Sequence, residues 1–193
     1  MATETEIKLR LLADPGPIRR SLRSLGFRVS KRRVHEMNVL FDTPEFSLRK
    51  QGMLIRLRAV NSRTILTYKG PPQPGKHKRR EEIESGVENS QNFERVLSRL
   101  GYAPVFRYEK FRTEYGQSGT PGIVTVDETP IGNFLEIEGP ASWIDRTAKA
   151  LGFSTPDYIT KSYGTLYIDY CAALGIQPRN MLFRAQPRRK FPG

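Results

Sequence analysis

Cysteine is nearly absent from this sequence, and long apolar stretches are missing. Cys171 is the single cysteine among 193 residues, so no disulfide can form within the chain and a reducing, cytoplasmic setting is expected. The N-terminus shows no apolar signal region, and no run approaches the length needed to cross a membrane, so neither export nor membrane insertion is expected. Hydrophobic residues make up 37%, which still allows one domain with one sizeable core.

Acidic residues are outnumbered by basic ones. Lys and Arg total 32 against 20 Asp and Glu, which gives a formal net charge of +12. Such a balance indicates an anionic partner, which could be nucleic acid, a membrane surface or a phosphorylated small molecule. The acids lie within basic segments, and this is unusual for a protein that merely coats nucleic acid.

The opening stretch alternates between charged and apolar side chains. In a β-strand, Glu4, Glu6 and Lys8 would point to one face, while Ile7 and Leu9 would point to the other. Two carboxylates about 7 Å apart on one strand repel each other in a closed site, and a divalent cation is the usual reason to tolerate this. Taken by itself, the pentapeptide also fits a solvated edge strand.

The same alternation returns along the chain and predicts an α+β fold with an eight-stranded antiparallel β-barrel and helices packed outside. Strands are expected within 4–9, 27–41, 53–60, 64–69, 80–84, 105–115, 123–127 and 134–138, and helices within 15–25, 90–100, 142–151 and 162–174. A turn is expected at 48–52. The single domain is expected to cover residues 1–175, followed by a mobile basic tail at 176–193.

If the barrel closes, the charged faces of its strands share one lumen. The basic residues facing it would be Arg56, Arg58, Lys69, Arg80, Lys110 and Arg112, and the acidic ones Glu4, Glu6, Glu136 and Glu138. Like charges at low dielectric are costly, so a polyanion is expected inside. Hard cations could bridge the carboxylates and a bound phosphate, as in phosphoryl-transfer sites.

Several blocks of the sequence resemble one family. The stretch Glu4-Thr5-Glu6-Ile7-Lys8 resembles the ExExK signature of the CYTH superfamily of triphosphate tunnel enzymes, which includes class IV adenylyl cyclases and thiamine and inorganic triphosphatases. Further blocks over about residues 3–170 are similar to the same family: Phe41 to Pro44, Leu54 to Arg58, Leu66 to Pro71, Arg80 to Glu84, Tyr108 to Arg112 and Phe134 to Glu138. The blocks at 66–71 and 80–84 look most like the cyclase branch. One departure is Leu40, where many relatives have tyrosine.

The resemblance implies residue roles in a tunnel that binds a triphosphate with Mg²⁺ or Mn²⁺. Metal ligands would be Glu4, Glu6, Glu136 and Glu138, with Asp127 as a further ligand or as an orienting residue. Phosphate-binding residues would be Lys8, Arg56, Arg58, Lys69, Arg80, Lys110 and Arg112. Lys8, Glu6 and Lys69 would be the catalytic residues.

Three functions fit these features. The first is a metal-dependent triphosphatase, in which water attacks an inorganic, nucleoside or thiamine triphosphate; the second is a class IV adenylyl cyclase that makes cyclic AMP and pyrophosphate. The third is a non-catalytic binder of polyphosphate or of an RNA 5′ end. The first is favoured because hydrolysis needs no base pocket, so the expected partner is a small-molecule triphosphate rather than nucleic acid or membrane. A homodimer is left open.

Residues outside this pattern are interpreted as ordinary structure. His35 and His77 have no metal-ligand spacing and are expected at the surface. Tyr163, Tyr167 and Tyr170 are expected to serve packing.

Overall fold

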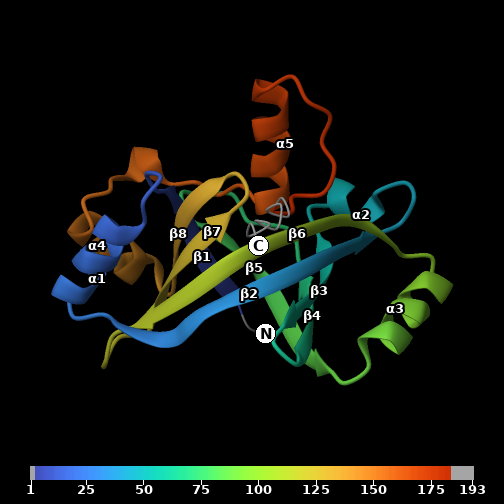
Figure 1. The fold of residues 1–193 in the computed structure, drawn as a ribbon, viewed down its shortest axis with the longest axis horizontal. Coiled ribbons are helices and arrows are strands. Elements are labelled where there is room, and N and C mark those ends of the chain that lie inside the picture. Colours follow the sequence, from blue (N-terminus) through green and yellow to red (C-terminus); the bar gives the residue numbers. More distant parts are fainter. Residues whose placement is uncertain (1–2, 184–193) are drawn as a thin grey trace, which may run out of the picture.

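Eight antiparallel strands close into a barrel in the computed structural model, which describes residues 3–183 (Figure 1). The strands are β1 (Thr3–Arg10), β2 (Arg28–Asp42), β3 (Leu54–Val60), β4 (Arg63–Lys69), β5 (Lys78–Val87), β6 (Ala103–Gly116), β7 (Ile123–Thr129) and β8 (Gly132–Glu138). They follow the order β1-β5-β4-β3-β2-β6-β7-β8, with β8 returning to β1. The expected eight-stranded barrel is therefore confirmed, and the strand expected within 27–41 is one continuous strand, β2.

The helices lie outside the barrel. Figure 1 shows α1 and α4 on the left, α3 on the right and α5 at the top between them. They are α1 (Gly16–Ser24), α2 (Ser47–Lys50), α3 (Ser90–Arg99), α4 (Ala141–Ala150) and α5 (Tyr163–Ala173), with a 3₁₀ turn at Thr155–Asp157. Asn89 caps α3, because its side chain accepts the backbone N–H of Asn92.

Helix α2 replaces the turn expected at 48–52. The buried carboxylate of Asp42 explains this helix, since its two oxygens accept the backbone N–H groups of Thr43, Leu48 and Arg49. A charged acceptor at the start of a helix satisfies donors that no helical carbonyl can reach. The loop and the short helix are thus pinned to the end of β2.

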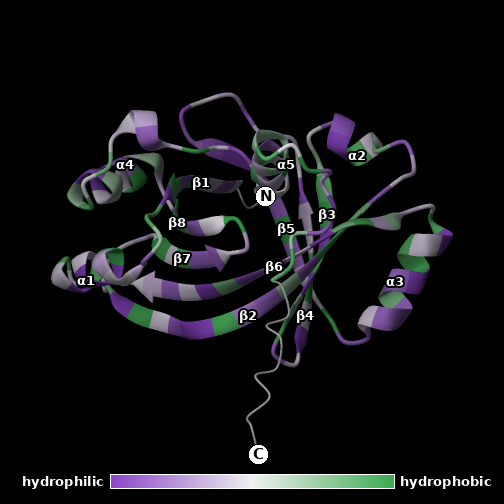
Figure 2. Ribbon diagram, turned by 45° about the horizontal axis from the view of Figure 1, so that its top comes forward, coloured by the Kyte–Doolittle hydropathy of each residue, from purple (hydrophilic) through white to green (hydrophobic). Residues whose placement is uncertain are grey.

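The apolar faces of the strands point outward and form three separate clusters beneath the helices. Ile7 and Leu9 of β1 are fully buried in the largest, which lies under α1 and α4. Figure 2 shows hydrophilic and hydrophobic residues interspersed along the ribbons of the sheet. On β1 they alternate regularly, because Glu6 and Lys8 point into the barrel while Ile7 and Leu9 point outward. Because the apolar residues serve the outer packing, the lumen is left to the charged ones.

The chain beyond Gly175 differs in part from the expected mobile tail. Met181 is 1% exposed, and its backbone N–H and carbonyl bond to Arg107 and Glu109 of β6. Residues 176–183 therefore belong to the folded unit, whereas the tail residues Arg184, Arg188, Arg189 and Lys190 lie outside the described range. None of the described helices is long and apolar enough to cross a bilayer.

Candidate functional site

The lumen contains a cavity of about 290 Å³ in which the charged residues of different strands meet. All the expected phosphate-binding residues line it, together with four of the five expected metal ligands. These are Glu4, Glu6, Lys8, Arg56, Arg58, Lys69, Arg80, Lys110, Arg112, Glu136 and Glu138. The fifth, Asp127, is fully buried behind Lys110 and Arg112.

The charges in this lumen nearly balance. Among the described residues, nine basic and seven acidic side chains line the cavity. Antiparallel register explains the pairing, because Glu4 stands opposite Arg80, Lys8 opposite Glu136, and Arg112 opposite Asp127. The expectation that the lumen could not stay empty of a polyanion is therefore wrong: the protein supplies its own counter-charges, and a phosphate would have to exchange with them.

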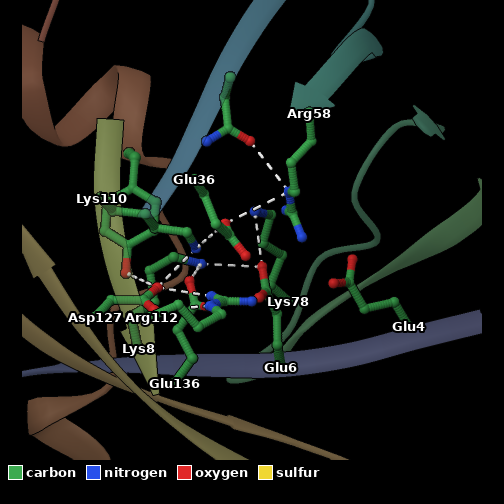
Figure 3. A network of polar contacts seen from close by, with 12 residues as sticks. Glu4, Glu6, Lys8, Glu36, Arg58, Lys78, Lys110, Arg112, Asp127 and Glu136 are labelled. Atoms are coloured by element: carbon green, nitrogen blue, oxygen red, sulfur yellow. Dashed lines mark hydrogen bonds and ion pairs between the residues drawn. The ribbon is translucent and has the colours of Figure 1, made fainter. Parts of the chain in front are cut away.

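Glu6 is shared by two lysines at the centre of the site (Figure 3). Its Oε1 accepts hydrogen bonds from Lys8 Nζ and from Lys78 Nζ, each at 3.0 Å. Burial by itself would raise the pKa of Glu6, but Lys8 and Lys78 lower it well below the ordinary value. Burial and the nearby Lys8 ammonium lower the pKa of Lys78 to about 8. Lys78 is thus the lysine of this pair that gives up its proton more readily.

Lys69 and Arg80 hold Glu4 from the neighbouring strands. Lys69 Nζ lies 2.6 Å from both oxygens of Glu4 and 3.0 Å from Glu82 Oε1. Arg80 Nε lies 3.5 Å from Glu4 Oε2. Glu4, Lys69 and Arg80 therefore lie together, as expected. Glu82 joins them, because it lies two residues from Arg80 and faces the same side of β5.

Asp127 organises the opposite wall of the tunnel. Its carboxylate accepts hydrogen bonds from Lys110 Nζ (2.8 Å), from Arg112 Nε (2.7 Å) and from the Tyr163 hydroxyl (2.8 Å). Arg112 also contacts Glu136. Because its oxygens are occupied by three donors, Asp127 is suited to orienting Lys110 and Arg112 rather than to binding a metal.

Two residues of β2 belong to the site and were missed from the sequence. Glu36 Oε2 lies 3.5 Å from Arg58 and 3.6 Å from Lys110, and Asn38 Oδ1 accepts a hydrogen bond from Arg58 Nε at 3.1 Å. Burial opposes ionisation of Glu36, yet Lys110, Arg112 and Arg58 lower its pKa to about 2. Glu36 and Asn38 are two residues apart and therefore face the same side of β2. This spacing could have identified them, but the basic residues at the start of the strand made its alternation hard to recognise.

Other expectations need correction. Lys78 was missed because the strand was begun at Arg80, although it lies two residues earlier and so on the same face. Tyr163 was assigned to packing, whereas its hydroxyl bonds to Asp127 and its ring lies 5.4 Å from Lys8 Nζ. His77 is not a free surface residue, because its Nε2 lies 2.8 Å from Asp145 Oδ1 and its side chain is 9% exposed.

The carboxylates at the β1–β8 junction fit a hard cation by their chemistry. Glu6 stands directly opposite Glu138, and like charges in register destabilise a sheet. Burial and the Glu4 and Glu6 carboxylates raise the pKa of Glu138 to about 7, and within residues 3–183 Glu138 forms no ion pair. In that range, no three His, Cys, Asp or Glu side chains are arranged as a ready set of ligands. Carboxylate oxygens suited to a hard cation are therefore present, but Glu4, Glu6 and Glu136 are paired with basic side chains and only Glu138 among these four has no ion pair within residues 3–183.

Within residues 3–183, two buried guanidinium groups of the lumen each have an N–H without an acceptor. The Nε atoms of Arg56 and Arg80 are buried and have no hydrogen-bond partner among the described residues. Burial, and next the neighbouring Arg56, lower the pKa of Arg58. An unpaired buried N–H is costly, so an acceptor oxygen beside these guanidinium groups would stabilise them.

Comparisons with known proteins agree with this geometry. A CYTH domain model matches residues 2–163. A protein of Methanocaldococcus jannaschii named "Putative adenylate cyclase" is 29% identical over 170 residues, which cover 83% of this chain and 95% of that protein. The PH1819 protein of Pyrococcus horikoshii has a solved structure with a TM-score of 0.73 at 26% identity, covering 86% of this chain and 99% of that one.

A further solved structure is that of a "putative adenylyl cyclase" from Hippeastrum, said to reveal a dominant triphosphatase activity. It has a TM-score of 0.59 at 18% identity and covers 91% of this chain and 97% of its own, so this likeness concerns the fold. The domain match spans most of the sequence and coincides with the eight strands whose inward faces build the charged tunnel. The chain belongs to the CYTH family.

Proposed function

We propose that this protein is a metal-dependent enzyme that binds a triphosphate in the tunnel and releases phosphate by attack of water. One observation carries the proposal. The same cavity holds buried guanidinium Nε–H groups without acceptors and, among the described residues, one carboxylate without an ion pair, that of Glu138. A triphosphate together with a divalent cation would satisfy both.

Arg56, Arg58 and Arg80 are the first phosphate ligands in this scheme. The Nε–H groups of Arg56 and Arg80 have no acceptor among the described residues, and guanidinium groups match phosphate oxygens in a bidentate fashion. Lys110 and Arg112 are held in place by Asp127 and would complete the clamp from the opposite wall. Such preorganised cations stabilise the charge that develops on a transferring phosphoryl group.

Glu4, Glu6, Glu136 and Glu138 would hold Mg²⁺ or Mn²⁺. When bound, the ion would neutralise phosphate oxygens and favour an ionised nucleophile. Glu4 and Glu6 must exchange lysine partners for the ion, and the freed Lys69 and Lys78 would then face the phosphates.

The two lysines that contact Glu6 differ in the direction of their pKa shifts. Burial opposes the charge on Lys8, but Glu136 and Glu6 raise its pKa above the ordinary value, so Lys8 remains a cation that donates to phosphate oxygen. Burial and the Lys8 ammonium lower the pKa of Lys78 to about 8, so Lys78 loses its proton more readily than Lys8. We therefore assign Lys8 and Lys69 to charge stabilisation.

Adenylyl cyclase activity is the second candidate, because a 29% identical relative is named as a cyclase. Both reactions need the same clamp. In the cyclase, the ribose 3′-hydroxyl attacks the α-phosphorus and pyrophosphate leaves. In the hydrolase, water attacks the terminal phosphorus and orthophosphate leaves.

The experiment incubates the protein with ATP, tripolyphosphate or thiamine triphosphate, with Mg²⁺, Mn²⁺ or EDTA, and identifies the products by ³¹P NMR. We expect orthophosphate, dependent on the metal. Cyclic AMP with pyrophosphate would identify the cyclase instead, and no turnover of any triphosphate would refute the enzyme.

A matched pair of variants separates an enzyme from a polyphosphate binder. Glu6→Gln should reduce metal-dependent turnover at least about 100-fold, since it removes a proposed ligand and the anchor of two lysines. Glu88→Gln changes an exposed glutamate that does not line the lumen and should leave turnover unchanged. If the wild type turns over no triphosphate, and Glu6→Gln binds polyphosphate as tightly as the wild type or more tightly, the protein is a polyphosphate binder rather than an enzyme.

A further inference from the structure

A cluster of polar side chains outside the tunnel joins α4 to two other segments of the chain. His77 Nε2 lies 2.8 Å and the Tyr158 hydroxyl 3.1 Å from Oδ1 of Asp145, a residue of α4. Lys76 Nζ lies 2.9 Å from the other carboxylate oxygen. We name Asp145, His77 and Tyr158 the Asp145 cluster. None of these three residues lines the tunnel cavity.

Ionisation decides which group donates in each of these contacts. Burial by itself would raise the pKa of Asp145, but the hydrogen bonds from Lys76, His77 and Tyr158 lower it. A carboxylate accepts hydrogen bonds and donates none, so His77 Nε2 carries the proton of its contact. Burial and the bond to Asp145 raise the pKa of Tyr158 to about 12, so its hydroxyl remains a donor at neutral pH. Asp145 therefore binds two donors that are distant in the sequence.

His77 stands at the start of β5. The next residue, Lys78, is the first of that strand, and it is paired with Glu6 at the end of the β1–β5 ladder. The loop before it is exposed at residues 71–76, whereas the His77 side chain is 9% exposed. The end of a strand frays readily unless it is held. The contact of His77 with Asp145 therefore holds the backbone that presents Lys78 to the tunnel.

Tyr158 stands beside a second contact with β1. The N–H of its neighbour Ile159 lies 2.8 Å from the Lys8 carbonyl oxygen, and the Ile159 carbonyl oxygen lies 2.9 Å from the Lys8 nitrogen. Because β8 pairs with the opposite edge of β1 here, Ile159 occupies the edge that β5 leaves beyond Glu6. The Asp145 cluster thus connects the segment that presents Lys78 to the segment that flanks Lys8.

These two lysines meet on one carboxylate inside the tunnel. Lys8 Nζ and Lys78 Nζ each lie 3.0 Å from Glu6 Oε1 (Figure 3). A bound phosphate has to exchange with Glu6 for these donors. Glu6 then no longer fixes the spacing of the two ammonium groups, and transition-state stabilisation requires donors that stay in place. A support that does not involve Glu6 would meet this requirement.

We propose that Asp145, His77 and Tyr158 are positioning residues, which hold Lys78 and Lys8 at a fixed spacing for the reacting phosphate. They act from outside the tunnel, through the backbone on either side of β1. This inference rests on the proposed function, because it assumes that the two lysines donate to a triphosphate.

The kinetic signature follows from where the other phosphate ligands lie. Arg56 and Arg58 are on β3 and Arg112 is on β6, and the bonds of the Asp145 cluster do not involve them. Loss of the cluster should therefore leave substrate binding nearly intact and weaken the contacts that matter when charge develops on the phosphoryl group. Such a loss lowers kcat and kcat/KM together.

The test compares His77→Ala with His77→Gln, using whichever of ATP, tripolyphosphate and thiamine triphosphate the wild type turns over fastest. Affinity for the same triphosphate is measured by calorimetric titration in EDTA. We expect His77→Ala to lower kcat about ten-fold while KM and the affinity in EDTA change less than about two-fold, because small misplacements at a reacting centre are costly. The amide of His77→Gln can place an N–H near the position of Nε2 and should restore at least about half of kcat.

Two further variants control for folding and for charge. Lys76→Ala is the matched control, because Lys76 contacts the same carboxylate but its side chain is 53% exposed, and kcat should stay unchanged. Tyr158→Phe removes one hydroxyl and keeps the ring, so it tests the cluster even where His77→Ala does not fold. It should lower kcat about three-fold, near the lower end for one hydrogen bond.

The outcomes separate this inference from the proposed function. An unchanged kcat in both His77→Ala and Tyr158→Phe would overturn the inference, while turnover by the wild type would uphold the proposed function. The inference is equally overturned if affinity in EDTA falls as much as kcat, if Lys76→Ala loses as much as His77→Ala, or if His77→Gln restores nothing. Absence of turnover by the wild type would refute the proposed function and this inference with it.

Discussion

Replacing Asp127 by asparagine tests how far this protein depends on ion pairs inside its lumen. Asp127 is fully buried, and its carboxylate receives donors from Lys110, Arg112 and Tyr163. Asparagine keeps the shape of the side chain but removes the negative charge, and its amide group can place a donor against these donors. Two buried cations would then lack their principal counter-charge on that wall.

The expected loss follows from the burial. Removing one partner of a buried, hydrogen-bonded ion pair costs about 3–5 kcal/mol, because the remaining charge stays desolvated. For a chain of this length, each 1 kcal/mol lowers Tm by about 2–4 °C, so a decrease of about 6–20 °C is expected.

The matched control is Asp169→Asn. Asp169 lies 2.7 Å from Lys161 Nζ, as close as the contacts of Asp127, but these two side chains are 49% and 56% exposed. An exposed pair contributes about 0–1 kcal/mol, so this variant should hardly change Tm. Calorimetry at neutral pH and low salt compares the two. Equal decreases in Tm for both variants would refute the reasoning that burial makes the lumen pairs important.

Two further substitutions test the wall of the barrel. The pKa of Glu36, about 2 in the fold against 4.5 as the ordinary value, means that its ionised form stabilises the protein above pH 4.5 and that this contribution is lost as pH falls toward 2. Glu36→Gln should therefore cost about 2–3 kcal/mol at pH 7 by urea unfolding, with a difference that shrinks below pH 4.5; a constant difference would contradict the assignment. Gly122→Ala should destabilise by about 1–3 kcal/mol, because its Cβ would overlap the Trp143 ring and lie 2.6 Å from the Glu138 carbonyl oxygen. Gly86→Ala, where a Cβ meets nothing within 4 Å, is the control, and an equal loss there would argue against crowding.

Local rules predicted which side chains face inward. A strand alternates with a period of two, so Glu4, Glu6 and Lys8 had to share a face whatever their neighbours were, and the structure places all three in the lumen. The same rule located Arg56 and Arg58. It failed at Lys78 because the start of that strand was placed two residues too late, and at Glu36 because basic residues interrupt the pattern of the strand.

The sequence by itself determined the barrel and the set of charges that enters it, because backbone geometry and polarity act over a few residues. The tertiary structure alone decided which charges neutralise one another, since the pairing of Glu6 with Lys78 depends on the register between strands more than sixty residues apart in the sequence. It also decided that Tyr163 reaches Asp127 from a helix, and that α2 and α5 enclose a space beside the tunnel. Contacts between distant segments arise from the packing of whole elements, which no local pattern encodes.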